Sequence, residues 1–396
     1  MSQYLVPGAV SETSRARPEL ISARSLARFD PAGGDPRSQK ERELPYAELL
    51  NRRLVIVAGK GGVGKSTVAV ATGILAARRG LRTLIASTFE PLLLARTFGV
   101  RSIGKKPVRL ADRLSGVWLD QELIFDEYIR DVVRVKMVFK RLKESLVYQY
   151  FAAAVPGLKE LTLLDRIATL VDAQEDGHDG QPFDLVVVDS PATGHGASVL
   201  EVPQRARFGF SVGPITRMAE RLQSLLSDQD RTAVVLVTLA EEMPVSETIE
   251  LLHRLGSRSG VRAAVVVVNN FTPAPFADAG LEDLFNELVD SGGAGLGPLH
   301  ATLPPEAELI AAARFQEARW QTNFEHIERL RRELVIPQVY VPFLAVPDDH
   351  PGGVPDLVAR HLISTPDFAP PAVPCVRESV ERALVRVGAL KEYADD

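Results

Sequence analysis

Short apolar runs recur along the chain, and stretches with helical spacing separate most of them. Residues 53–58 (RLVIVA) run up to Gly59, and so apolar a run is typical of a strand buried on both faces. A helical pattern over 65–79 follows and ends at Gly80. Further strands are expected at 82–87, 116–119, 184–189, 232–238, 262–268 and 337–342. This alternation predicts an α/β fold with a doubly wound, mostly parallel sheet.

One interval between predicted strands is unusually long. About a hundred residues separate the second strand from the one that ends at Asp189, whereas a crossover needs only a dozen or more. Within it, residues 120–172 place apolar side chains at three- and four-residue steps, namely Phe125, Tyr128, Ile129, Val132, Phe139, Leu142 and Leu146. We therefore expect a helical subdomain inserted into the sheet at about 120–172.

The two ends of the chain differ in pattern from its middle. Residues 1–45 have no sustained period and include a segment rich in Pro, Gly and charge, which predicts a flexible leader. The main domain is expected over 46–355, with a long charged helix at 306–334 near its end. Residues 356–396 form a C-terminal extension. Its Pro-rich stretch precedes an amphipathic helix with Val376, Val380, Leu384 and Val387 on one face.

Composition narrows the functional classes. The net charge is -5, which gives no support for nucleic acid as the main partner. The single cysteine, Cys375, excludes an internal disulfide, a Cys-x-x-Cys zinc site and an iron–sulfur cluster. No apolar run approaches the ~20 residues of a membrane span, and the N-terminus shows neither a signal peptide nor a transit peptide pattern. These features together predict a cytoplasmic protein.

A glycine-rich segment matches the phosphate-loop motif. Residues 59–67 read GKGGVGKST, which fits G-x-x-x-x-G-K-[ST] between a predicted strand and a predicted helix. Backbone N–H groups of such a loop and the helix N-terminus bind phosphates. Lys65 is expected to contact the β- and γ-phosphates, and the Ser66 hydroxyl to ligate Mg²⁺. The predicted nucleotide site comprises Gly59, Lys60, Gly61, Gly62, Val63, Gly64, Lys65, Ser66 and Thr67.

One further residue of this motif and two residues around the end of a later predicted strand are also candidates for the site. Lys60 is an early second lysine, which phosphate binding alone does not require. Asp189 ends an apolar strand, and its carboxylate is expected to hold Mg²⁺ because a phosphate loop precedes it and a Gly/Thr-rich turn follows. His195 lies in that turn. It senses the γ-phosphate, links to the helical insertion, or is an ordinary hydrogen-bonded loop histidine; the sequence leaves all three open.

Several segments together resemble the ArsA-type anion-transporting ATPase family. They are the early-lysine loop, DSPATGHG at 189–196, TLAEEMPVSETIE at 238–250 and VVVVNN at 265–270. The resemblance covers about residues 50–355 and points to a bacterial ArsA-like branch of the family. That family includes the arsenite-pump ATPase and the ATPases that target tail-anchored membrane proteins.

The resemblance implies roles for particular residues. Lys60 would cross a dimer interface to the partner's nucleotide and act in hydrolysis, and Asn269 would hydrogen-bond the adenine of ATP. Residues 342–347 resemble the segment that closes over the base. From sequence alone, Lys60 is otherwise a solvated surface lysine and Asn269 a strand-end turn residue.

The chain departs from the family's usual pattern in its switch segment. The family reads S-T-D-P-A-H after the second strand, whereas this chain reads Ser87-Thr88-Phe89-Glu90-Pro91-Leu92. Phe89 has no acceptor for an attacking water, so Glu90 is the expected catalytic replacement for the family's Asp. The alternative is that Glu90 is a solvent-facing carboxylate in a slow or inactive ATPase.

The scarcity of cysteine and methionine sets this chain apart from two branches of the family. With Cys375 alone, we expect neither the cysteine-coordinated metalloid site of the arsenite branch nor the zinc-bridged dimer of the eukaryotic targeting branch. The chain has four methionines, which weakens a general Met-rich groove for membrane tails.

We therefore expect an ATP-hydrolysing, Mg²⁺-dependent dimeric switch that handles a client protein or a membrane-protein partner. The dimer would form with a second copy or with a paralogue. Two alternatives stay open. One is a positioning ATPase of the ParA/MinD type, disfavoured by the helical insertion and by the lack of a clear basic stripe. The other is a regulatory nucleotide-binding module with little hydrolysis, which the altered switch keeps open.

Overall fold

The centre of the molecule is an eight-stranded sheet. The structure is a computed structural model and describes residues 45–133, 157–172, 181–191, 199–206, 213–273, 306–344 and 353–364. The strand order is β3-β4-β2-β5-β1-β6-β7-β8, and every neighbouring pair is parallel except β3 and β4. The strands are β1 Leu54–Gly59, β2 Thr83–Ser87, β3 Val108–Ala111, β4 Leu114–Trp118, β5 Leu185–Asp189, β6 Thr232–Leu239, β7 Ala263–Phe271 and β8 Gln338–Pro342. The predicted α/β class with a mostly parallel sheet is confirmed.

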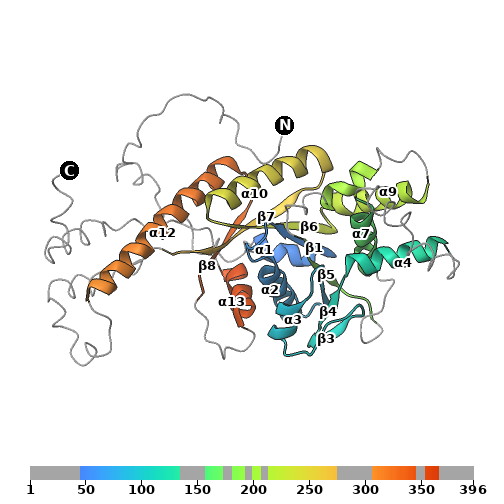
Figure 1. Ribbon diagram of the computed structural model, residues 1–396, viewed down its shortest axis with the longest axis horizontal. Helices are drawn as coiled ribbons and strands as arrows, with labels where there is room; N and C mark the ends of the chain where they lie inside the picture. Colours follow the sequence, from blue (N-terminus) through green and yellow to red (C-terminus); the bar gives the residue numbers. More distant parts are fainter. Residues whose placement is uncertain are drawn as a thin grey trace, which may run out of the picture.

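Helices cover both faces of the sheet, as Figure 1 shows. The described helices are α1 Pro45–Glu48, α2 Lys65–Arg78, α3 Leu92–Thr97, α4 Gln121–Val133, α7 Leu158–Val171, α9 Pro214–Ser227, α10 Glu242–Arg254, α12 Glu306–Glu333 and α13 Gly353–Ser364. Residues 199–206 are also helical, η2 (Leu49–Asn51) is a 3-10 turn, and η3 (Leu255–Ser259) is a π-helical turn.

The two faces of β1 show how the layers are built. Leu54, Ile56 and Ala58 belong to the core shared with α4, α7, α9, α10 and α12. Val55 and Val57 point the other way, into the core shared with α1, α2 and α13. Side chains of a strand alternate between faces, so a strand covered on both sides has to be apolar throughout. This explains why the continuous apolar runs predicted seven of the eight strands.

Strand β3 was missed by the sequence patterns. It is four residues long, its burial alternates between partly buried and exposed, and it pairs antiparallel with β4 at the edge of the sheet. The pairing register shifts between Arg109 and Ala111. A half-exposed edge strand lacks the apolar run that identified the others.

The predicted helical insertion at 120–172 is helical where the structure describes it. Helices α4 and α7 come between β4 and β5 and pack together (Figure 1). The Lys159 ammonium lies 2.6 Å from Glu122 Oε1 and 5.9 Å from the centre of the Phe125 ring. Residues 134–156 lie outside the described residues.

The other predictions for the chain ends have different outcomes. The leader predicted at 1–45, apart from Pro45 at the start of α1, and the C-terminal helix with Val376, Val380, Leu384 and Val387 lie outside the described residues. Helix α13 crosses the boundary predicted at 355 and packs against α2, where Asp356 pairs with Arg78. The domain around the sheet therefore extends at least to Ser364. In the described part of the chain, no helix has the length and apolarity to span a membrane.

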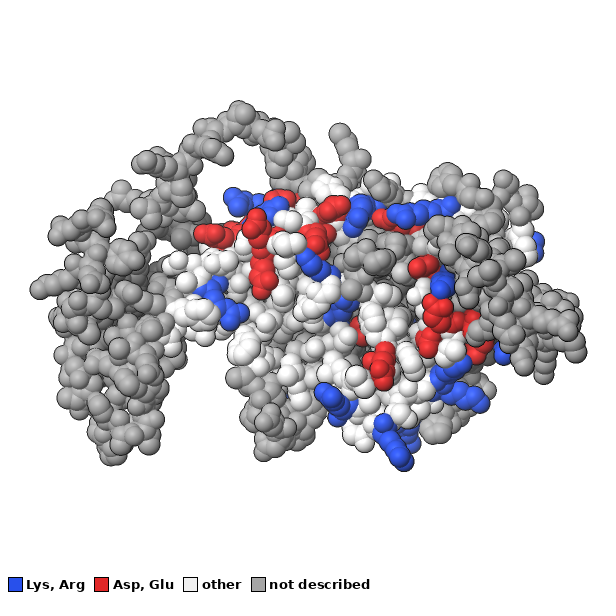
Figure 2. All heavy atoms as spheres, in the orientation of Figure 1, with Lys and Arg blue, Asp and Glu red and all other residues white. Residues whose placement is uncertain are grey.

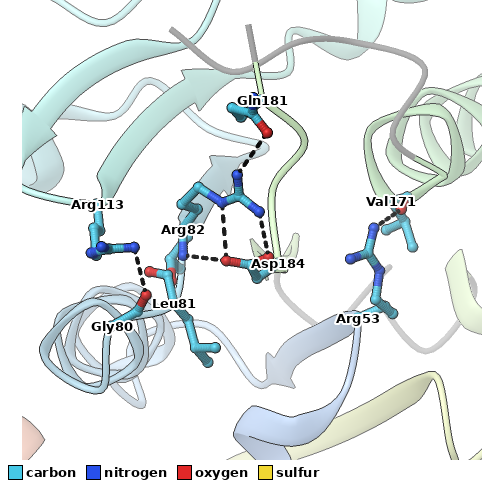
Figure 3. Close-up of polar contacts among 9 residues, drawn as sticks. Arg53, Gly80, Leu81, Arg82, Arg113, Val171, Gln181 and Asp184 are labelled. Carbon is cyan, nitrogen blue, oxygen red and sulfur yellow. Dashed lines mark hydrogen bonds and ion pairs between the residues drawn. The ribbon is translucent and has the colours of Figure 1, made fainter. Parts of the chain in front are cut away.

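Side chains at the amino ends of the strands form hydrogen bonds with neighbouring elements (Figure 3). Arg82, before β2, makes two side-chain hydrogen bonds to Asp184, before β5, and its backbone N–H makes a third. These hydrogen bonds lower the pKa of the Asp184 carboxyl. Arg53 donates to the Val171 carbonyl at the end of α7, 2.9 Å away. The opposite, carboxyl edge of the sheet holds the loops that matter below.

Candidate functional site

The glycine-rich loop lies between β1 and α2, as its sequence predicts. Gly64 adopts a left-handed conformation (φ 93°) and directly precedes the first residue of α2. At Gly59, a side chain would meet the carbonyl oxygen of Val237 at 2.3 Å, so the loop leaves β1 pressed against β6. The strand, loop and helix are thus in the arrangement that presents backbone N–H groups to a phosphate.

Lys65 is folded back onto its own loop. Its ammonium donates to the Lys60 carbonyl at 2.8 Å, and the residue is buried. Burial lowers the pKa of this ammonium, while the Asp189 charge opposes the shift. A phosphate arriving at the loop offers Lys65 a charged acceptor in place of a neutral carbonyl, and a charge-assisted hydrogen bond is the stronger of the two.

Asp189 ends β5 at the same edge of the sheet. It is 5% exposed, and its Oδ1 has no hydrogen-bond partner among the described residues. Burial raises the pKa of its carboxyl; a hydrogen bond with the Ser66 side chain and the Lys65 charge act against that rise. A buried carboxylate oxygen without a partner, next to a hydroxyl, fits the oxygen ligands that Mg²⁺ prefers.

Lys60 is paired within its own chain. Its ammonium lies 2.7 Å from Glu247 Oε1 on α10, and the two side chains are 30% and 41% exposed. The structure thus gives Lys60 a partner that its sequence motif did not predict. Its predicted reach toward a neighbouring subunit stays a prediction.

Asn269, near the end of β7, contacts the phosphate loop directly. Its Nδ2 donates to the Val63 carbonyl at 2.9 Å. A side chain at Gly64 would come within 2.2 Å of the same Nδ2, so this close approach requires glycine there. The structure thus brings Asn269 to the predicted loop, while its contact with adenine stays a prediction.

The switch segment after β2 is tied to the end of β5. The N–H and the hydroxyl of Thr88 both donate to the Asp189 carbonyl, at 3.2 and 2.8 Å. Phe89 and Glu90 follow at once, and both are exposed. Glu90 therefore follows, two residues later, a threonine that is hydrogen-bonded to the end of β5. Its role in hydrolysis stays a prediction, and His195 lies outside the described residues.

Asn323 on α12 is a site-supporting residue that the sequence motifs did not identify. Its Nδ2 donates to the Ala240 carbonyl at 2.8 Å, and its Oδ1 accepts from the Thr272 N–H at 2.7 Å. It therefore joins the segments that follow β6 and β7. The first leads into α10, and the second comes just after Asn269. One signal was available: Asn323 stands on the buried stripe with Ile327, Leu330 and Leu334, and a buried amide needs partners.

Comparison with known proteins agrees with this geometry. The family model described as "Anion-transporting ATPase" matches residues 52–212 and 210–283. The chain is similar to "ATPase BagA" of Mycobacterium tuberculosis, with 27% identity over 304 residues, which is 75% of this chain and 88% of that protein. It is also similar to the "Putative arsenical pump-driving ATPase" of Halobacterium salinarum, with 27% identity over 57% of this chain and 36% of that protein. The protein of the same description from Chlorobaculum tepidum is 24% identical over 56% of this chain and 62% of its own length.

Proposed function

Because the chain belongs to the anion-transporting ATPase family, we propose that it is a Mg²⁺-dependent, dimeric ATP switch acting on a client protein or a membrane-protein partner. The protein is an ATPase. The metal, the dimer and the client are the proposed parts. The observation that best supports the metal is the buried, unpartnered Oδ1 of Asp189 beside Ser66 and Lys65.

Each site residue has a separate role in transferring the γ-phosphoryl group to water. Backbone N–H groups of the loop bind the phosphates, and Lys65 moves from the Lys60 carbonyl to their oxygens. Asp189 and Ser66 would hold Mg²⁺. When bound, this ion neutralises charge on the transferring phosphate. Glu90 accepts a hydrogen bond from the attacking water and orients it in line with the leaving group.

The dimer is proposed through Lys60. Its pairing with Glu247 is half-exposed, and such an ion pair contributes little to stability. The ammonium can therefore exchange Glu247 for phosphate oxygens of a nucleotide that faces it from a second subunit. In that position its charge stabilises the transition state for hydrolysis.

The helical insertion is the proposed client-facing part. One end of α7 is joined to α4 by the Lys159–Glu122 ion pair, and its middle lies over the end of β5 that leads to Ser190. Leu163, Leu164 and Ile167 line a small apolar pocket there together with Thr88 and Ser190. A shift of the switch thus reaches α7 directly. Arsenite and antimonite are not expected to stimulate the ATPase, because soft metalloids bind several thiolates and the chain has one cysteine.

The deciding experiment combines turnover with oligomeric state. ATP hydrolysis and light-scattering mass are measured with ATP, with and without Mg²⁺, for the wild type and for Lys65→Ala. We expect a Mg²⁺-dependent rate and an ATP-dependent dimer in the wild type, and loss of both in Lys65→Ala. Lys159→Ala, which removes a lysine outside the predicted nucleotide site, serves as the control. Hydrolysis by a species that stays monomeric throughout would rule out the dimeric switch.

A further inference from the structure

A concentrated set of cations lies at the β3 end of the sheet. Between residues 96 and 113, the chain has six basic residues and one acidic residue, although the whole protein has a net charge of -5. We call this set the basic corner; it consists of Arg96, Arg101, Lys105, Lys106, Arg109 and Arg113. All six are exposed. Such a local reversal of charge creates a positive potential on an otherwise acidic protein.

The fold gathers these cations in one region. Side chains of Leu94 on α3 and Leu110 on β3 both pack toward Gly116 of β4, so α3 lies against the β3–β4 edge of the sheet. Figure 2 shows Lys and Arg side chains projecting from the lower rim of the molecule, where Figure 1 places α3 and β3.

Most of the corner's charge is available to a partner. Lys105 and Arg109 make only long, exposed ion pairs, each 3.5 Å, with Glu127 and Asp112. Within the described residues, Arg96, Arg101 and Lys106 have no ion pair at all. Cations held by strong intramolecular pairs would be neutralised, and these are not.

Apolar side chains are exposed beside the same cations. Leu92 and Leu93 on α3 are 53% and 37% exposed, and Phe89 just before the helix is 42% exposed. Leu92 stands one helical turn from Arg96, so the outer side of α3 presents an apolar and a basic group together. Leu94, by contrast, points into the core.

We propose that the basic corner and the outer side of α3 dock on an anionic membrane surface. Cations attract the negative headgroups, and the exposed Phe and Leu side chains enter the boundary between headgroups and acyl chains. A nucleic acid partner would use the cations but leave three apolar side chains in water, so the combination favours lipid. This inference goes beyond the proposed ATPase function, because it assigns a part of the protein that binds a membrane.

The position of the apolar side chains links docking to the nucleotide site. Phe89 directly follows Thr88, whose hydroxyl donates to the Asp189 carbonyl. A nucleotide that moves the switch therefore also moves part of the docking surface. Docking itself depends on charge and not on hydrolysis, so it is measurable even in a protein that does not turn over ATP.

The test is sedimentation of the full chain with vesicles. Vesicles of phosphatidylcholine alone are compared with vesicles containing one third phosphatidylglycerol, at low and high salt. Arg101→Glu/Lys106→Glu is compared with Arg217→Glu/Arg262→Glu, which makes the same change in net charge at exposed cations on α9 and before β7. Leu93→Gln tests the apolar part, and the solution ATPase rate of each variant reports folding.

The expected result is binding to the anionic vesicles that falls with salt. The corner double variant should lose about tenfold or more in partition coefficient, since each cation near the surface contributes separately. The control double variant should stay within about twofold of the wild type. Equal sedimentation with both vesicle types, an equal loss in both doubles, or binding to duplex DNA in place of vesicles would overturn the proposal.

Discussion

Lys60 and Glu247 form an ion pair across 187 positions of sequence, with 2.7 Å between Nζ and Oε1. One residue belongs to the phosphate loop and the other to α10, after β6. The pair holds the motif's early lysine within its own subunit. Since both side chains are partly exposed, its strength is small and its exchange for a stronger acceptor is easy. In this structure, the Lys60 ammonium is thus neutralised by a carboxylate of its own subunit.

Replacing Lys60 should separate binding from hydrolysis. We expect Lys60→Ala to retain ATP affinity within about threefold and to lose about 100-fold in kcat, because its charge acts on the transition state at the neighbouring site. Steady-state kinetics with a fluorescent nucleotide titration measures both quantities. Lys105→Ala, which also removes a lysine paired with one glutamate, is the control. Near-wild-type turnover in Lys60→Ala would remove the cross-dimer role.

Neutralising Asp189 should stabilise the nucleotide-free protein while ending its metal-dependent activity. Burial raises the pKa of this carboxyl, so the folded state binds the proton more tightly than the unfolded state. Stability from this group is present at low pH and is lost as pH rises through the raised pKa. At neutral pH the charge is a cost, which Asp189→Asn removes. We expect a melting temperature about 2–4 °C higher without ligand, and no Mg²⁺-ATP shift.

Asp184 supplies the matched contrast at the other end of β5. Its pKa is lowered by the hydrogen bonds of Arg82, so its contribution to stability is present above its unfolded pKa and is lost as pH falls through the folded one. Asp184→Asn should therefore lower the melting temperature at neutral pH. Thermal unfolding of both variants across pH would contradict this assignment if the two shifts had the same sign.

Glu90 is expected to position the attacking water. Glu90→Gln keeps the shape of the side chain but weakens its acceptor, so single-turnover hydrolysis should fall by about 100-fold while ATP affinity is retained. Rapid-quench measurement of bound ATP gives the rate without product release. Glu127→Gln, at a partly exposed carboxylate on α4, is the control. An unchanged rate in Glu90→Gln would mean that the switch lacks a catalytic carboxylate at this position.

Asn323 should matter to stability and to the nucleotide site together. Asn323→Ala leaves the Ala240 carbonyl and the Thr272 N–H without their partner, and each unpaired buried group costs about 1–3 kcal/mol. We expect a loss of about 2–4 kcal/mol in urea unfolding, together with weaker ATP binding. Thr322→Ala changes the exposed neighbour and should do neither. A pure loss of stability, with unchanged ATP affinity in the folded fraction, would limit Asn323 to a structural role.

The helical insertion should respond to nucleotide. The apolar pocket between α7, β1 and the end of β5 includes Thr88 of the switch, so rearrangement there changes the packing of α7. We expect amide hydrogen exchange in α4 and α7 to change by about tenfold between the nucleotide-free and ATP-bound states. Helix α13, on the opposite face, is the internal reference. Identical protection of α4 and α7 in both states would argue against a client role for the insertion.

Features that depend on a local sequence pattern, such as strands and the phosphate loop, could be predicted from the sequence. Seven strands were recognisable because a strand covered on both faces is a continuous apolar run, and the phosphate loop because its glycines have fixed spacing. The partners of those residues were not recognisable. Nothing near Lys60 points to Glu247, and nothing near Val63 points to Asn269, since each contact depends on which loops the sheet order brings together.

Two polar residues beside the site, Asn323 and Thr88, could not be predicted from sequence because their contacts depend on the fold. Asn323 is a polar residue within a long charged helix, where it looks like one more solvated side chain. Only its spacing from Ile327 and Leu330 places it on the buried face, and only the fold supplies its two backbone partners. Thr88 is similar, because its bond to Asp189 depends on β2 pairing with β5.

Strand β3 affects whether the sheet edges of two copies of this protein can pair. A parallel sheet that ended at β4 would leave its full row of backbone donors and acceptors open to a strand from another molecule. The chain instead turns back on itself for four residues, shifts register within them and places Arg109 on the rim. So short, irregular and charged an edge is a poor template for further strands. This edge of the sheet is thereby protected against edge-to-edge pairing with another copy.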